Sequence, residues 1–254
     1  TKVRGYVYDM EEYMHKNVDR YLKETNAKGK KLRKVDTPFI DEARVPMGCT
    51  SAEPDMANGS ASAEANAGLG EVKTAPPQGG VVPENKSSDF NRVAAGIIMQ
   101  TMYGARMARQ DLLRCVGHLA TYLTQWGPEE DIKLHRMMSY LNNTSDFKQI
   151  AFIGDDPKHL YLGLFSDSDL AGDRRDMKST SGVFLVLLGP HTFYPLGFIA
   201  KKQTATSHSS TEAELVAMDL ALREEGIPAL DLWKVLLGRE LKLVVFEDNQ
   251  ATTK

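Results

Sequence analysis

Two aspartates, Asp167 and Asp169, stand one residue apart at the end of an apolar run, and a glycine turn with Asp173 follows them. Such carboxylates are either a solvated strand end or the beginning of a metal site. Two further acids stand at comparable places. Glu214 lies in the first turns of a helical pattern, and Asp248 ends a later strand pattern. The chemistry therefore depends on whether the fold brings these acids together.

Strand ends and helix starts are where one edge of an α/β sheet gathers its functional groups. Carboxylates that meet there repel one another and stay ionised only when cations neutralise them. Magnesium suits such a site because it prefers oxygen ligands. Two ions roughly 3.5–4 Å apart can stabilise the attacking and leaving oxygens of phosphodiester hydrolysis. The order of Asp167, Glu214 and Asp248 thus favours a magnesium site, although a single aspartate of this kind is more often solvated.

The elements that position these acids follow from a change of period at residue 151. In the strand expected over 191–203, Pro195 predicts an irregularity. The turn residues Gly189-Pro190 predict a hairpin between this strand and the one before it. Ser210 is the expected N-cap of the long helix, whose stripe is Leu215, Met218 and Leu222. The predicted elements are strands at 161–169, 182–189 and 191–203, helices at 209–225 and 228–238, and a strand at 241–250. This order predicts an α/β fold with a mixed sheet.

The residues before 151 predict helices and one linker. An amphipathic helix is expected over 6–24, and helices are expected over 90–125. A third helix should begin at Pro128, and its expected inner face carries Ile132, His135, Met138 and Leu141. Between them, 46–89 is rich in Gly, Ala, Ser and Pro and lacks aromatic residues, which predicts a flexible, disordered linker.

Composition limits the class of protein. The 254 residues carry a net charge of −3, so there is no overall basic signature for nucleic acid. The charge is uneven, however, with ten basic and five acidic residues over 1–34 and eleven against fifteen over 151–254. A polymer-binding arm, including Lys28 to Lys34, and a cation site fit this pattern, but scattered solvated charges fit it equally.

Cysteine usage and hydropathy indicate the cellular compartment. Cys49 and Cys115 form no CxxC pattern, which favours a reduced, intracellular compartment, in cytoplasm or nucleus. No apolar run approaches the roughly 20 residues of a membrane span. The first residues lack an apolar signal core and an initiator methionine, so we expect a fragment of a longer chain.

Three segments resemble the ribonuclease H region of copia-type retrotransposon Pol polyproteins. In the order of that family, they read FSDSDLAGDRRDMKSTSGVFLVLLG, FIAKKQTATSHSSTEAELVAMDLA and VVFEDNQAT. The resemblance covers about 152–254. Upstream, 97–144 resembles the segment that joins reverse transcriptase to ribonuclease H, and 4–25 with the later VDTPF resembles the end of the reverse transcriptase.

The resemblance implies a ribonuclease H-like fold that cuts the RNA strand of an RNA–DNA hybrid with two magnesium ions. Asp167, Glu214 and Asp248 match the family's catalytic, metal-binding acids, the same three that the spacing indicates. Asp169, Asp173 and Glu212 also match family positions, and we interpret them as structural. Glu247 adds negative charge where the family has a small residue or cysteine.

Strand-end lysines and hydroxyls in the matched motifs could hold hybrid phosphates, although solvated lysines are equally common. This weaker nucleic-acid-binding set comprises Lys178, Ser179, Thr180, Lys201, Lys202 and Gln203.

The resemblance also predicts an organisation. We expect a reverse-transcriptase tail over 1–45, the linker over 46–89, a helical connection over 90–145 and a ribonuclease H-like domain over 151–254. The family has a fourth metal-site residue in a later strand and helix, which follow the position of Lys254. We therefore expect an open sheet edge, reduced activity and a protein partner that covers the edge. The alternative is a catalytically inactive remnant that serves as a structural or protein-binding subunit.

Overall fold

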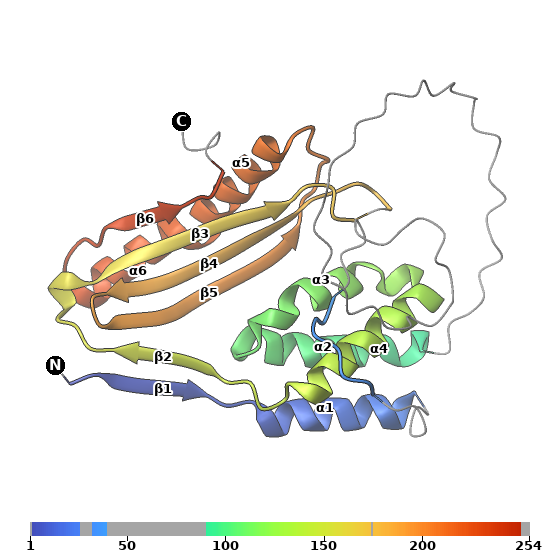
Figure 1. Ribbon diagram of the computed structural model, residues 1–254. Coiled ribbons are helices and arrows are strands. Elements are labelled where there is room, and N and C mark those ends of the chain that lie inside the picture. The colour runs from blue at the N-terminus through green and yellow to red at the C-terminus, as the bar shows by residue number, and fades with distance from the viewer. Residues whose placement is uncertain (1, 26–31, 40–89, 174, 250–254) are drawn as a thin grey trace, which may run out of the picture.

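The computed structural model describes residues 2–25, 32–39, 90–173 and 175–249. These residues form a mixed α/β fold with one six-stranded sheet (Figure 1). The strands are β1 (Arg4–Tyr8), β2 (Gln149–Ile153), β3 (Tyr161–Asp169), β4 (Thr180–Gly189), β5 (Thr192–Lys202) and β6 (Leu243–Phe246). The helices are α1 (Glu11–Glu24), α2 (Asn91–Met107), α3 (Leu113–Thr121), α4 (Pro128–Asn143), α5 (Ser210–Ala221) and α6 (Ile227–Leu237).

The sheet has the order β1-β2-β5-β4-β3-β6. Strands β3, β4 and β5 form an antiparallel meander, whereas β6 returns parallel to β3 after a crossover through α5 and α6. A parallel neighbour requires such a helical crossover. The predicted ribonuclease H-like mixed sheet is thus confirmed, and within the described residues β6 forms one edge of it.

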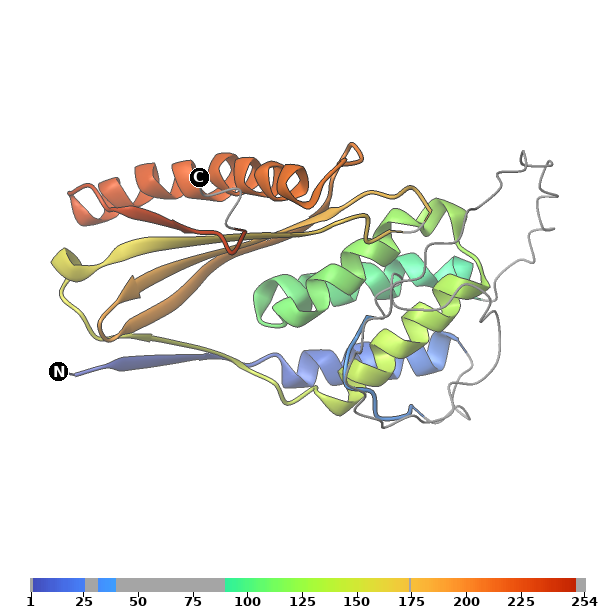
Figure 2. The ribbon, with the colours of Figure 1, turned by 45° about the horizontal axis from the view of Figure 1, so that its top comes forward.

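Helices α5 and α6 cover one face of the sheet (Figure 2). Leu162 and Leu164 of β3 and Leu185 of β4 form the core beneath them, together with Leu220 and Ala221 of α5. A π-helical turn, Leu222–Gly226, joins the two helices directly. The two helices that the sequence predicted separately therefore follow one another without a loop.

Helices α1 to α4 form a second core. Tyr21 of α1, Ile97 of α2, Leu119 of α3 and Met137 of α4 are fully buried in it. Phe198 and Ala200 of β5 pack against this core from the sheet, so the two units meet at the end of β5. No helix in the described part of the chain is long and apolar enough to cross a membrane.

The turn chemistry of the meander is confirmed. Gly189 pairs with Thr192 across a two-residue turn, which is the predicted hairpin. The register shifts between Leu185 and Val186, opposite the stretch from Pro195 to Gly197. Since proline cannot donate a ladder hydrogen bond, this irregularity lies where the sequence predicted it.

The sequence pattern did not predict strands β1 and β2. The helix predicted over 6–24 begins only at Glu11, and Arg4–Tyr8 is strand β1, paired antiparallel with β2. Because β2 pairs with β5 through Phe152 and Phe193, both strands extend the main sheet. The side chains of β1 are nearly all exposed, and β2 has a single buried residue, Ala151, so pairing rather than sequence pattern defines the two strands.

Three details of the helices were also wrong. Ser209, not Ser210, is the N-cap of α5, since its hydroxyl accepts the backbone N–H of Glu212. Leu215, predicted in the core, is 50% exposed, and so is Ile132 of α4, at 62%. In both helices neighbouring residues take the inner face, among them Ala217 in α5. The linker predicted over 46–89 lies outside the described residues, and the domain boundaries remain predictions.

Candidate metal centre

Two of the three predicted acids stand at strand ends, with Asp167 in β3 and Asp248 two residues after β6. The parallel register of β3 and β6 pairs Phe165 with Phe246. Asp167 and Asp248 each stand two residues further on, so the same register places them side by side at one edge of the sheet. The side chains of Phe165 and Asp167 share a face because side chains alternate along a strand.

Helix α5 supplies the third acid. The cap at Ser209 fixes where the helix begins. Ala213, Ala217 and Ala221 are buried at a spacing of four residues, which lets the backbone of α5 approach the sheet closely. Glu214 follows the first of these alanines and is itself only 6% exposed. The alanine face of α5 thus brings a carboxylate down to the sheet.

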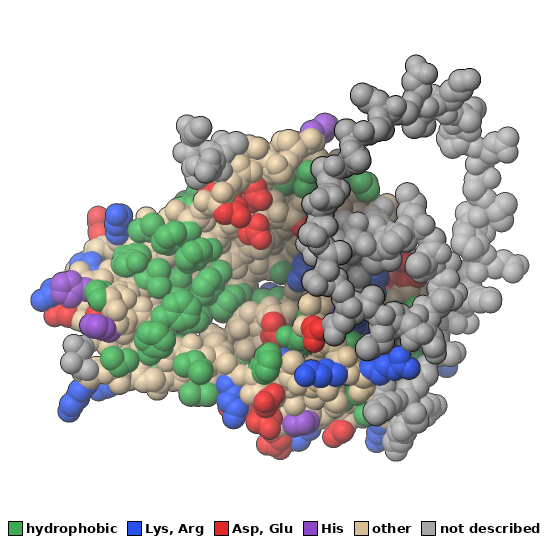
Figure 3. Space-filling model, viewed as in Figure 1, with side chains coloured by type: hydrophobic (Ala, Val, Ile, Leu, Met, Phe, Trp, Pro, Cys, Tyr) green, Lys and Arg blue, Asp and Glu red, His purple; other side chains and the backbone are tan. Residues whose placement is uncertain are grey.

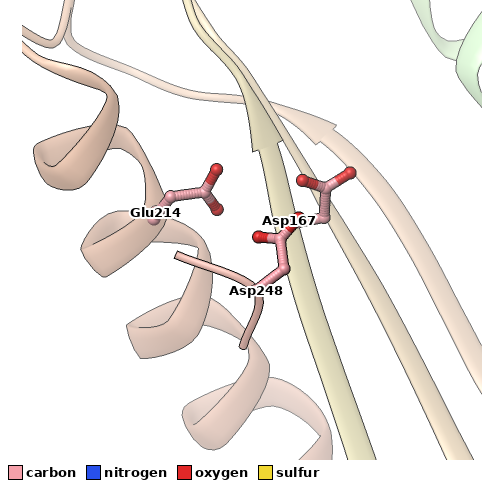
Figure 4. Close-up of side chains that lie close together, drawn as sticks. All are labelled: Asp167, Glu214 and Asp248. Carbon is pink, nitrogen blue, oxygen red and sulfur yellow. The ribbon is translucent and has the colours of Figure 1, made fainter. Parts of the chain in front are cut away.

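The structure brings Asp167, Glu214 and Asp248 together. One carboxylate oxygen from each lies within 4.8 Å of those from the other two. Figure 4 shows Glu214 projecting from α5 toward β3, where Asp167 and Asp248 lie. Asp167 and Asp248 are exposed, whereas Glu214 is buried. The cluster therefore has an inner carboxylate and an open, solvent-facing side.

The electrostatics of the cluster are unfavourable for three ionised acids. Burial raises the pKa of Glu214 to about 7, and the charges of Glu247, Asp167 and Asp248 add to the effect. Glu247 is held nearby, since its Oε2 accepts the hydroxyl of Ser166 at 2.9 Å. A positive charge among these groups would remove the repulsion.

The donor set fits magnesium. All three groups are carboxylates, which are the hard oxygen ligands that magnesium takes in small number while it keeps waters and phosphate oxygens. The Oε2 atom of Glu214 is buried without a hydrogen-bond partner. A buried polar atom of this kind normally has a partner, and a cation in the cluster would provide it.

The loop between β3 and β4 is attached to the helical unit. Asp169 accepts the backbone N–H of Thr180 and pairs with Arg114 of α3. Asp173 is buried, where it accepts the hydroxyl of Tyr122, the residue that follows α3, and the ammonium of Lys202 from β5. These bonds hold the pKa of Asp173 far below its usual range, in spite of its burial. Both acids are structural, as expected. Asp173 shapes the local turn, since its Oδ1 accepts the backbone N–H of Arg175 at 3.0 Å, and both acids also join separate segments.

Glu212 also has a structural contact. Its carboxylate accepts the backbone N–H of His208 at 2.7 Å, which completes the first turn of α5. This placement agrees with the structural role that we expected for it.

Most of the weaker nucleic-acid-binding set is engaged inside the protein. Lys202 pairs with Asp173 and Asp176 at 2.6 and 2.8 Å. Gln203 is buried and donates to the hydroxyl of Ser181 and the carbonyl of Ala213.

The other members of the set are placed differently. Ser179 and Thr180 are buried, and the hydroxyl of Ser179 accepts the backbone N–H of Ala171. Lys201 is more exposed and pairs with Glu224. Lys178 makes no ion pair among the described residues. Phosphate binding by this set remains a prediction.

Arg114 was missed by the sequence analysis. It is a single basic residue in an apolar helical pattern, and nothing in the sequence indicates that α3 lies beside β3. In the structure Arg114 pairs with Asp169, two residues beyond Asp167. The candidate site therefore has a basic neighbour from the helical unit.

Comparisons with known proteins place the chain among transposon sequences. No protein-family profile matches it. The Pol polyprotein of transposon RE2 from Arabidopsis thaliana is 36% identical over 119 residues, and that of transposon RE1 from the same plant is 34% identical. Each alignment covers 47% of this chain but only 8% of the polyprotein.

A third relative is much shorter. The secreted RxLR effector protein 161 from Plasmopara viticola is 33% identical over 131 residues, which are 52% of this chain and 85% of the effector. The chain therefore belongs to the family that this effector shares with the retrovirus-related Pol polyproteins of copia-type transposons.

Proposed function

We propose that the sheet region of this retrotransposon-derived chain hydrolyses the RNA strand of an RNA–DNA hybrid. The supporting observation is the cluster of Asp167, Glu214 and Asp248, whose carboxylate oxygens lie within 4.8 Å of one another. A cluster of acids at the edge of a mixed sheet is suited to metal-assisted phosphodiester hydrolysis. The similarity to retrovirus-related Pol polyproteins of transposons agrees with a nucleic-acid substrate.

Each carboxylate has a distinct part in this proposal. Asp167 and Asp248 stand on the open side, where they would hold divalent ions against a substrate phosphate. Glu214 would complete the set of metal ligands from α5, on the buried side of the cluster, with its Oε2 as the inner ligand. Two bound magnesium ions would supply an activated water and stabilise charge on the leaving 3′ oxygen.

The alanine face of α5 and the strand register keep the three acids in place before substrate arrives. Such fixed positions lower the reorganisation that binding and reaction require. The chain's own contribution is therefore the position and charge of three side chains.

The test is cleavage of an end-labelled RNA–DNA hybrid by the purified chain in magnesium and in chelator. We expect magnesium-dependent cutting of the RNA strand that Asp167→Asn abolishes. Asp231→Asn is the matched control, because Asp231 is an exposed acid on α6 outside the cluster. Folded protein without magnesium-dependent cutting, or equal cutting by Asp167→Asn, would contradict the proposal.

A second candidate is a protein-binding subunit without catalysis. The observation that favours it is the aromatic face of the sheet, opposite α5 and α6, which comprises Phe152, Phe165, Phe184, Phe193, Phe198 and Phe246. Four of these rings are 36–39% exposed, and Figure 3 shows hydrophobic side chains gathered over the strands on this side. Exposed apolar patches of this kind often mark protein interfaces.

The relative named as an effector also allows a role outside transposition. A stable complex of the chain that Phe152→Ser disrupts, with no cleavage of hybrid, would favour this second candidate, because Phe152 belongs to the aromatic face and is 39% exposed. Cleavage that is unaffected by Phe152→Ser would favour the first.

A further inference from the structure

A groove leads from the acid cluster toward the helical unit. It encloses about 290 Å³ and lies between the aromatic face and the start of α3. Asp167, Phe165 and Phe184 line it from the sheet, and Arg114, Leu113 and Gln110 line it from the helical side. Because Asp167 belongs to both, the groove continues the candidate metal centre, and we call it the α3 groove.

Arg114 is the cationic residue of the α3 groove. Its Nη2 atom donates to Asp169, and its guanidinium lies 4.9 Å from the ring centre of Phe39. Its side chain is 30% exposed. Among the described residues, these contacts leave its Nε and Nη1 atoms without a hydrogen bond. A stacked and paired guanidinium with free donors is prepared for a phosphate, which accepts in the same fork geometry.

The distance between Arg114 and the acid cluster also suits two neighbouring phosphates of one strand. Asp169, which holds Arg114, is two residues beyond Asp167 on the same side of β3. Two residues of strand span about 7 Å. This is comparable to the spacing of neighbouring phosphates along one nucleic-acid strand. Arg114 would thus meet a phosphate next to the one at the acid cluster.

The floor of the α3 groove fits the rest of a nucleotide. The rings of Phe165 and Phe184 lie 5.7 Å apart and form an apolar surface beside the charged group. A cationic groove with aromatic side chains is the usual platform for a nucleic-acid strand, with phosphates on the basic groups and sugars or bases on the rings. The arrangement therefore suits a strand that passes from Asp167 to α3.

We propose that the α3 groove binds the nucleotide adjoining the cleaved bond and that Arg114 contacts its phosphate. This inference rests on the proposed hydrolysis of a hybrid, since the acid cluster fixes where the strand enters. It adds a substrate contact from the helical unit to a site that is otherwise built from the sheet and α5. Arg114 also holds the loop that follows Asp167, so its two roles must be separated by experiment.

The first experiment measures hybrid affinity by fluorescence anisotropy at several salt concentrations, with Ca²⁺ in place of Mg²⁺. We expect Arg114→Gln to weaken binding about tenfold, the effect of losing one charge-assisted contact. The slope of log affinity against log salt should fall by about 0.9, which corresponds to one phosphate. Arg114→Lys should keep most of that slope. Arg106→Gln is the matched control, because Arg106 is exposed on α2 and does not line the groove.

The second experiment separates phosphate binding from positioning. Magnesium affinity of the free protein, measured by calorimetry, should be the same in Arg114→Gln as in the unsubstituted chain. A loss of magnesium affinity that matches that of Asp169→Asn would mean that Arg114 only positions β3, and it would overturn the inference. Thermal melting establishes that each variant is folded.

The third experiment uses the unsubstituted chain, so that it does not depend on the folding of any variant. Phenylglyoxal modifies arginines, and peptide mass spectrometry reports each position. We expect hybrid to protect Arg114 and to leave Arg106 reactive. Equal reactivity of Arg114 with and without bound hybrid would overturn the inference and leave the proposed function standing. No binding of hybrid by the unsubstituted chain would overturn both.

Discussion

Replacing Glu214 by glutamine should stabilise the metal-free protein at neutral and alkaline pH. Glu214 is buried beside Glu247, Asp167 and Asp248, and its pKa is raised from 4.5 to about 7. Folding therefore becomes less favourable whenever this carboxylate ionises, because the unfolded chain ionises it more easily. Glutamine has the same shape without the charge, so Glu214→Gln removes this penalty.

The size of the effect follows from the two pKa values. At about 1.4 kcal/mol for each pKa unit, the full penalty has an upper limit of about 3.4 kcal/mol. The neighbouring aspartates are exposed and screened by water and salt, which reduces the effect to about 1–2 kcal/mol.

The raised pKa also fixes how the stability difference between Glu214→Gln and the unsubstituted chain changes with pH. A raised pKa means that the penalty is absent below pH 4.5, grows between pH 4.5 and 7, and is complete above 7. The free energy of unfolding of Glu214→Gln should therefore exceed that of the unsubstituted chain at pH 8 and equal it at pH 4.

Urea unfolding in excess chelator, followed by circular dichroism at pH 4 and pH 8, measures both differences. Glu212→Gln is the matched control, since Glu212 lies on the same helix but is half exposed. A gain at pH 8 that saturating magnesium abolishes would show that the ion neutralises the same charge. A variant that is less stable than the unsubstituted chain at pH 8, or a gain that does not change with pH, would refute the reasoning.

Three further predictions concern the rest of the molecule. Asp173→Asn should lower the free energy of unfolding by about 2–4 kcal/mol, because it leaves the buried partners of Asp173 without their charge; since the pKa of Asp173 is lowered, this contribution should be present at pH 5 and fade as the pH falls below 4. Urea unfolding measures both, and an unchanged midpoint would argue against the buried network. Cys115 is buried and its pKa is raised to about 12, so peptide mapping should find it unmodified by maleimide in the native state at pH 8 and modified in denaturant. Gly238 ends α6 at φ +64° with open space around its Cβ position, so Gly238→Ala should cost only about 1 kcal/mol in thermal melts; a larger loss would mean that another contact is broken.

The sequence predicted those parts of the fold that depend on local chemistry. The hairpin at Gly189-Pro190 follows from turn residues, and β3 and β4 follow from their apolar runs. The three acids could be selected because each stands at the end of a strand or the start of a helix. Their convergence required that β6 pair in parallel with β3 and that α5 pack its alanine face on the sheet.

Other features depend on contacts that no local pattern encodes. Strands β1 and β2 are defined by pairing with each other, although the partners Tyr8 and Gln149 lie 141 positions apart in the sequence. The inner face of α5 is lined by alanines, which carry a weaker hydrophobic signal than the exposed Leu215. Packing distance, rather than hydrophobicity, decides which side of this helix faces the sheet.

The hydrogen bonds and ion pairs between the helical unit and the sheet could not be predicted from the sequence either. Asp173 and Tyr122 are hydrogen-bonded across 51 positions, and Arg114 reaches Asp169 across 55. Each of these residues alone is an ordinary surface type in the sequence. Only the placement of α3 beside the end of β3 turns them into an interface and gives the metal centre its basic neighbour.

The central claim is that Asp167, Glu214 and Asp248 together hold divalent cations. Isothermal titration of magnesium into the folded, chelator-free chain at pH 7.5 tests it most directly. The account predicts saturable binding that weakens at least about tenfold in Asp167→Asn and in Asp248→Asn, with unchanged binding in the control Asp231→Asn. Binding of equal affinity in all four proteins, or no binding by the folded unsubstituted chain, would contradict it.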